Sequence, residues 1–155
     1  MKKSLKSLLL ASLIVPLLGS GAHAADPKYP VESGKKQVLV QSDHSWNGGT
    51  YKPYPQGTPQ LTVIKLHIQK GHALPWHKHI APNAGYVEQG QLTLEDQKTG
   101  EKKVFKQGEA FAESVDQYHR GIATDPNQDT VLILTYAGTS KTPLSVPAPG
   151  EKNEY

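Results

Sequence analysis

From Leu61 onward, short segments of β-forming residues alternate with turns, and this rhythm restricts the fold more than any other feature of the sequence. The turns recur every 8–12 residues or so, a spacing typical of an all-β sandwich or barrel. They contain Lys70-Gly71, Gln89-Gly90, Lys98-Thr99-Gly100 and Gln107-Gly108. Beyond residue 24 no window shows the apolar period of a helix. We therefore predict an all-β chain.

The expected strands differ in how they are buried. Leu92 and Leu94 alternate with polar residues, so one face of their strand should be buried. Thr130–Tyr136 is apolar on both faces and is expected at the centre of a sheet. Gln89-Gly90 has the composition of a hairpin turn. The other expected strands are Gln37–Gln41, Leu61–Gln69, Ala84–Glu88, Gln91–Glu95, Lys102–Lys106, Glu109–Glu113 and Tyr118–Thr124.

The first 24 residues have the organisation of a secretory signal peptide. A basic start, Met1–Lys6, precedes an apolar run, Leu8–Leu18, and the site Ala22-His23-Ala24. The apolar run is shorter than the ~20 residues of a membrane-spanning helix. We expect cleavage after Ala24, export to the periplasm or the medium, and no membrane anchor.

The exported part is expected to be a single domain of about 130 residues, large enough for one core. It should consist of a flexible lead-in (25–36), a barrel (37–138) and a C-terminal tail (139–155). Three of the 17 basic residues lie in the signal peptide, and the fourteen that remain equal the 14 acidic ones. A net charge near zero gives no support for a nucleic-acid partner.

Three histidines are the candidate metal ligands. On a strand His77 and His79 would share a face, with Cα atoms about 6.5–7 Å apart. His119 follows in a second segment that also begins with a glycine. The exported chain has neither cysteine nor methionine, so thiolate and thioether ligands are excluded. Imidazole, carboxylate, amide and water ligands are left.

The spacing around these histidines resembles the two motifs of the cupin family. In the first motif Gly71, His77, His79 and Gly90 are in register, while Asn83 stands where the family has a glutamate.

The second motif keeps Gly108 and His119. Ser114, Asp116 and Ala123 replace its proline, second glycine and asparagine. The resemblance covers roughly residues 38–138 and is nearest to small cupins like quercetin dioxygenase.

This resemblance implies a double-stranded β-helix, or jelly-roll barrel, with a metal site inside. The implied ligands are His77, His79 and His119, with Asn83 in the place of the fourth ligand and water completing the site. Imidazole ligands suit iron, manganese, zinc, nickel or copper, so the divalent metal is not specified. The family also implies that a homodimer can form.

Glu113 is the candidate for a catalytic role. It stands six residues before His119, near the expected mouth of the barrel. It could orient a ligand histidine, act as general base or ligate the metal. A solvated glutamate at a strand end is the alternative.

Two functions are compatible with these features. One is a metal-dependent enzyme of oxygenase or isomerase type that acts on a small molecule. The other is a non-catalytic module that binds a small ligand or the metal itself. Because an amide at position 83 cancels no charge, the site is expected to favour an anionic ligand.

Overall fold

The computed structural model describes residues 32–155. The predicted signal peptide and residues 25–31 of the lead-in therefore lie outside the described residues. Residues 32–36 belong to a separate unit, and everything below concerns the unit Gln37–Tyr155. Within residues 32–155 there is no helix of the length and apolarity needed to cross a membrane.

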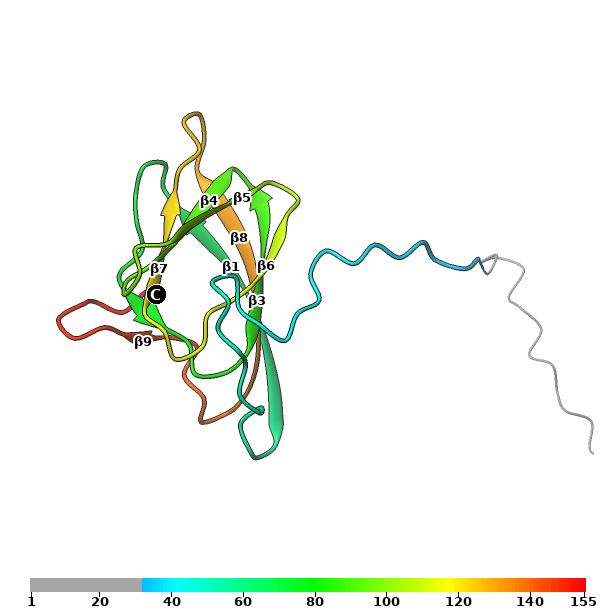
Figure 1. The fold of residues 1–155 in the computed structure, drawn as a ribbon. Helices are drawn as coiled ribbons and strands as arrows, with labels where there is room; N and C mark the ends of the chain where they lie inside the picture. Colours follow the sequence, from blue (N-terminus) through cyan, green and yellow to red (C-terminus); the bar gives the residue numbers. More distant parts are fainter. Residues whose placement is uncertain (1–31) are drawn as a thin grey trace, which may run out of the picture. The chain divides into compact units, whose positions relative to one another are not determined.

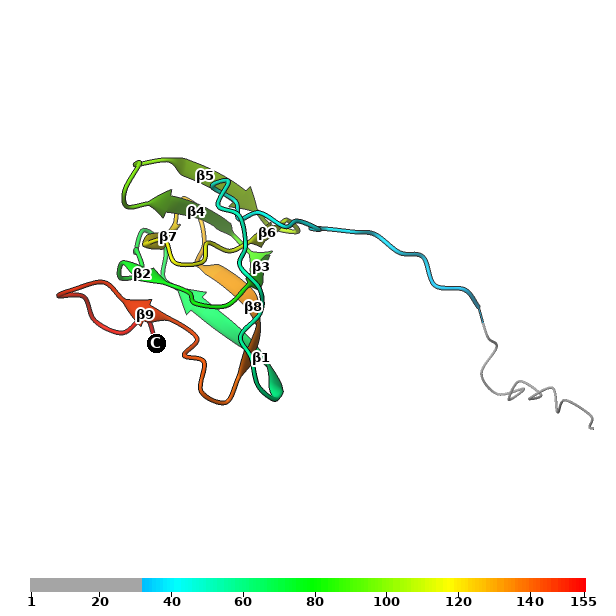
Figure 2. The same ribbon diagram turned by 60° about the horizontal axis from the view of Figure 1, so that its bottom comes forward.

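Nine strands of the described chain form two sheets with antiparallel ladders (Figures 1 and 2). The four-stranded sheet has the order β1 (Pro59–Ile68), β8 (Thr130–Thr139), β3 (Asn83–Gln89), β6 (Ala110–Ala112). The five-stranded sheet has the order β5 (Lys102–Lys106), β4 (Gln91–Asp96), β7 (His119–Ala123), β2 (His77–Lys78), β9 (Val146–Pro147). The described residues form no helix, which confirms the all-β prediction.

The core lies between the two sheets. Alternate residues of each strand point inward because the side-chain period of a strand is two. Leu92 and Leu94 of β4 are both buried, as predicted, and β8 occupies a central place between β1 and β3. The buried apolar cluster also includes Ile68, Val87, Phe105, Phe111, Leu132, Leu134 and Tyr136.

Two expectations about strands differ from the structure. Residues 37–41 form no strand, and Val38 and Leu39 are about half exposed, because a segment with high β-propensity still needs a partner strand. Gln89-Gly90 does not close a hairpin, since β3 and β4 lie in different sheets. Gly90 has a φ of 77°, so the chain turns there as expected, but it crosses to the other sheet.

Segments outside the main strands complete the walls of the barrel. Residues 139–155, expected as a tail, include β9, which pairs with β2 at the edge of the five-stranded sheet. The loop between residues 41 and 59 packs against the end of β6. Its Tyr51 hydroxyl donates a hydrogen bond of 2.6 Å to the carbonyl oxygen of Glu113.

The contact between Gly85 of β3 and Phe111 of β6 limits residue size at position 85. A Cβ atom at Gly85 would lie 2.2 Å from the Phe111 ring. This ring is buried in the core, so it has no room to move aside. We expect Gly85→Ala to lower the free energy of unfolding by about 2 kcal/mol or more through overpacking. Denaturant titration of the variant measures this change. Gly34→Ala is the control, since a Cβ atom there meets nothing within 4 Å, and equal loss in both variants would contradict this account.

Candidate metal centre

The three histidines converge on one point inside the barrel. His77 of β2 pairs directly with His119 of β7, and His79 follows two residues later on the same face. The ring centroids lie 4.6–5.1 Å apart, and one nitrogen from each ring lies within 4.8 Å of the other two. All three side chains are buried. Sheet register thus brings together residues that are forty positions apart.

Backbone carbonyl groups fix the orientation of each ring. The Nδ1 atoms of His77, His79 and His119 lie 2.9, 2.6 and 2.9 Å from the carbonyl oxygens of Pro75, Leu144 and Gln117, respectively. A carbonyl oxygen only accepts hydrogen bonds, so Nδ1 carries the proton and each Nε2 presents a lone pair.

The donor set fits a metal ion. Nε2 of His79 and Nε2 of His119 are buried without a hydrogen-bond partner, an arrangement that costs about 1–3 kcal/mol per atom unless something binds there. Three imidazole lone pairs on one point are the usual ligands of zinc, copper, iron or nickel. The three buried histidines could therefore hold a divalent metal ion.

Glu113 lies at the same point, directly after β6. Its Oε2 is 3.2 Å from Nε2 of His119, and its Oε1 is 3.9 Å from Nε2 of His79. The side chain is 6% exposed, so the structure does not show a solvated glutamate. It also faces the Nε2 atoms and not the Nδ1 atoms, a position unsuited to orienting a ligand histidine from behind.

A second carboxylate comes from Glu154, near the end of the described chain. Its Oε2 lies 3.4 Å from Nε2 of His77, and its side chain is 2% exposed. The sequence offers no signal for this residue. It lies outside both motifs, in a short polar segment without a strand, and only the folded chain brings it to the histidines.

Burial dominates the ionisation of the centre in the metal-free chain. It lowers the pKa of His77 to about 3, assisted by the neighbouring imidazoles, and it also lowers the pKa of His79. Burial acts in the same direction on His119, but the charge of Glu113 outweighs it and raises the pKa of His119. The pKa of Glu113 falls to about 2, because the imidazoles, His119 first, outweigh the effect of burial. Burial, with repulsion from Glu113, raises the pKa of Glu154 to about 7.

Asn83 is the first residue of β3 and points into the barrel. Across the sheet it pairs with Tyr136 on one side, and its carbonyl oxygen accepts a 3.0 Å hydrogen bond from the N–H of Glu113 on the other. Both polar atoms of its side chain are buried without a partner. Asn83 and Glu113 are thus cross-strand neighbours, and the carboxylate of the pair comes from Glu113.

The departures in the second motif keep the local structure. Asp116, at the place of the second glycine, has a φ of 59°, in the left-handed region that glycine favours. Its N–H donates a 2.8 Å hydrogen bond to the carbonyl oxygen of His79, and its carboxylate pairs with Lys52 at 2.6 Å. Ser114 is fully buried and bonds Asn47 at 3.0 Å.

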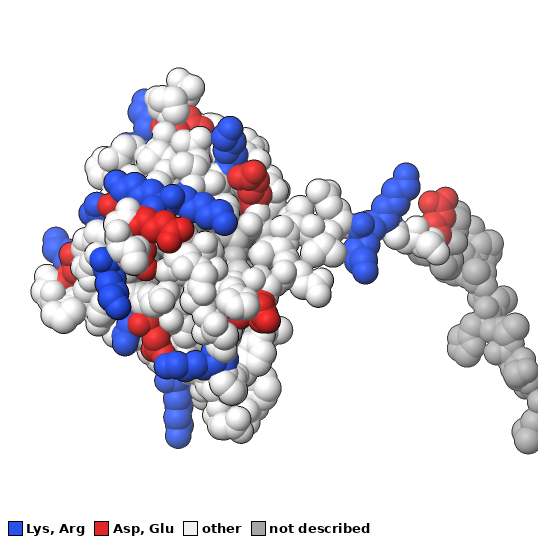
Figure 3. Space-filling model, viewed as in Figure 1, with Lys and Arg blue, Asp and Glu red and all other residues white. Residues whose placement is uncertain are grey.

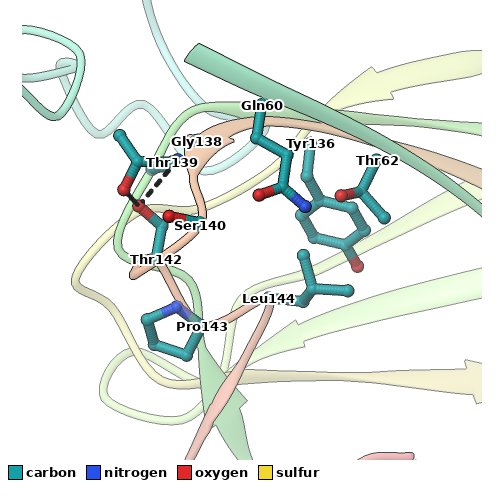
Figure 4. Close-up of a pocket in the computed structure, with 10 residues that line it drawn as sticks. Gln60, Thr62, Tyr136, Gly138, Thr139, Ser140, Thr142, Pro143 and Leu144 are labelled. Carbon is teal, nitrogen blue, oxygen red and sulfur yellow. Dashed lines mark hydrogen bonds between the residues drawn. The ribbon is translucent and has the colours of Figure 1, made fainter. Parts of the chain in front are cut away.

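A cavity of about 310 Å³ adjoins the centre (Figure 4). Two of its lining residues also belong to the wall of the metal centre. The Tyr136 ring lies 5.7 Å from the ring of His79, and Leu144 supplies the carbonyl that holds His79. Most of the remaining lining residues are uncharged and polar, namely Gln60, Thr62, Thr139, Ser140 and Thr142, and Ala81, Gly138 and Pro143 complete the wall. On the face drawn in Figure 3, basic and acidic side chains are interspersed.

Comparison with known proteins gives similarity in structure alone. No family model matches the sequence, and no curated protein matches it significantly. The DMSP lyase DddQ from Ruegeria pomeroyi DSS-3 matches over 60% of this chain and 45% of its own, less than two thirds of its length, with 15% identity and a TM-score of 0.50.

Two further solved structures match less closely in shape. An RmlC-like cupin from Shewanella frigidimarina NCIMB 400 has a TM-score of 0.44 at 22% identity over 52% of this chain and 68% of its own. KdgF from Halomonas sp. has a TM-score of 0.44 at 27% identity over 55% of this chain and 76% of its own. The two antiparallel sheets with three histidines between them agree with the jelly-roll fold expected from the motifs, and the similarity to DddQ is a similarity of fold alone: the chain has the cupin fold.

Proposed function

We propose that this chain is an exported metal-binding cupin that binds or transforms a small anionic molecule. One observation carries the proposal: three buried imidazoles, each fixed through Nδ1 by a backbone carbonyl, direct their Nε2 lone pairs at one point. A metal bound there would act as a Lewis acid on an oxygen of the ligand, with iron, manganese or copper also able to use O2.

Glu113 is the fourth protein ligand in this proposal. Its distances to Nε2 of His119 and His79 support the assignment, as does its position across from Asn83. The family motif has a glutamate at the position of Asn83 on β3. Here that carboxylate would come from Glu113, at the end of the neighbouring strand β6. Asn83 would then remain inside the barrel with free amide groups that can bond a ligand.

The charge of the centre supports an anionic ligand. A divalent ion with three neutral imidazoles and the Glu113 carboxylate keeps one positive charge when Glu154 is protonated or displaced, and poor hydration strengthens its field. A small carboxylate or enolate would neutralise this charge. The uncharged hydroxyl and amide groups of the adjoining cavity could bond polar groups on the rest of the molecule.

An enzyme of oxygenase or isomerase type is favoured over a non-catalytic binding module. A site that only stores a metal needs no groups beyond its ligands. Here Glu154 is held at the centre in addition to the four proposed ligands, and a buried carboxylate beside a metal can accept or donate protons.

Replacement of the histidines tests the site. We expect His77→Ala, His79→Ala and His119→Ala each to weaken metal binding by more than about 100-fold, beyond the effect typical of residues that only orient a ligand. The measurement is metal titration with elemental analysis, and circular dichroism checks that the barrel is folded. His72→Ala is the control because His72 is exposed in a loop. Unchanged metal content in all three variants would refute the proposed centre.

An exchange between neighbouring strands tests Glu113. We expect Glu113→Gln to weaken metal binding by at least about tenfold, since an amide cancels no charge. Asn83→Glu alone should tighten metal binding and weaken the binding of azide or acetate. The double variant N83E/E113Q should recover part of the lost metal affinity. If E113Q binds metal like the wild type, Glu113 is not a ligand.

Export belongs to the proposal because of the signal-like sequence before residue 25. A chain cleaved after Ala24 begins at Ala25. Intact mass and N-terminal sequencing of protein recovered from the periplasm or the medium should show this start. A mature protein that retains Met1–Ala24 would contradict export by this route.

A further inference from the structure

Glu154 differs from the other groups at the centre in how it is held. The histidines are bonded by backbone carbonyls, and Glu113 directly follows a strand in the four-stranded sheet. Residues 149–155 belong to no strand. Yet Glu154 is as deeply buried as the ligands, and its Oε2 has no hydrogen-bond partner. Burying a carboxylate is costly, and the oxygen without a partner is the one that faces the histidines, so its position points to a positive charge at the centre.

Residues 149–155, here called the strap, return the chain toward the metal centre. β9 pairs with β2, and the N–H of Ala148 donates a 2.8 Å hydrogen bond to the carbonyl oxygen of Trp76. A turn at Gly150, with a φ of 84°, then reverses the direction of the chain. Both ribbon views show the end of the chain beside β9 (Figures 1 and 2).

The far end of the strap is attached by hydrogen bonds between side chains, with Ser145 as a partner of both Glu154 and Tyr155. The hydroxyl of Tyr155 lies 2.9 Å from the hydroxyl of Tyr136. Tyr136 packs against His79 and also lines the cavity of Figure 4. The strap therefore ends at the wall shared by the metal centre and the cavity, and side-chain contacts hold it there without a strand ladder.

We infer that Glu154 is a displaceable carboxylate on the metal centre, which a small carboxylate ligand replaces when the strap opens. This inference rests on the proposed function, since it requires a metal at the three histidines. Glu154 reaches Nε2 of His77 on a side that Glu113 does not approach within 4 Å, so the two carboxylates take different positions. An incoming carboxylate has the same charge and the same two oxygen atoms as Glu154. It could therefore occupy the same position beside the metal.

In this arrangement Glu154 competes with a carboxylate ligand for the same position on the metal. A ligand that needs the open state binds with an affinity reduced by the fraction of molecules that are open. If the strap is closed in about nine molecules of ten, the apparent affinity for a carboxylate is about tenfold lower than without Glu154. Neutral molecules gain less from opening the strap, because they leave the charge of the metal uncancelled.

The test is an acetate titration of protein loaded with cobalt(II), followed by visible absorbance. Glu154→Gln should keep the metal and bind acetate about tenfold more tightly than the wild type. Glu151→Gln is the matched control, since it removes the same charge from an exposed position in the same strap and should change nothing. Tyr155→Phe removes the anchoring hydroxyl but no charge, and it should give a smaller gain of about fourfold, because the loss of one hydrogen bond raises the open fraction only in part.

The outcomes separate this inference from the proposed function. Equal acetate affinity in the wild type and in E154Q, with cobalt bound by both, would overturn the strap and leave the metal centre intact. A folded E154Q protein that no longer binds cobalt would also overturn it, because Glu154 would then be a permanent ligand. If the wild type itself binds no cobalt, the proposed function fails, and the strap fails with it.

Discussion

Three hydrogen bonds from imidazole to backbone determine the chemistry available inside this barrel. A buried histidine left to itself can rotate, change tautomer or take up a proton. The first two changes direct the lone pair away from the metal position, and the third removes it. The carbonyl oxygens of Pro75, Leu144 and Gln117 prevent the first two changes, and burial opposes the third for His77 and His79. These carbonyls belong to the chain segments that form the barrel wall, so a competent ligand set depends on an intact wall.

The inner face of the four-stranded sheet extends this arrangement away from the metal. Four polar residues form a row across neighbouring backbone segments, in the order Glu113, Asn83, Tyr136, Thr62. Tyr136 pairs with Thr62 on one side and with Asn83 on the other, and the N–H of Glu113 donates a hydrogen bond to the carbonyl oxygen of Asn83. The row begins with a carboxylate at the histidines and ends with hydroxyl groups in the cavity. A barrel interior is usually filled by apolar side chains, so this polar row is the part of the interior where the proposed ligand would bind.

The sequence predicted the all-β architecture and the convergence of three histidines, because both follow from local periods: two residues along a strand, and fixed offsets from glycine turns. It did not predict where strands find partners. Gly90 turns the chain, but whether β4 pairs with β3 depends on the other seven strands. Glu154 could not be predicted as a site residue for the same reason, since nothing in the local sequence distinguishes it from the exposed Glu151. Glu113 could be named as a candidate, but its orientation toward Nε2 required the folded sheet.

The left-handed conformation of Asp116 shows what the second motif demands at that position. An L-residue there costs about 1 kcal/mol or more relative to glycine, and aspartate is among the residues that tolerate it best. Its side chain contributes an ion pair with Lys52 that glycine could not make. The motif therefore specifies a torsion angle and a hydrogen bond to the carbonyl of His79, and several amino acids can supply them. Two chains can therefore share this turn, and the metal-binding geometry beside it, while different amino acids stand at the position of the second glycine.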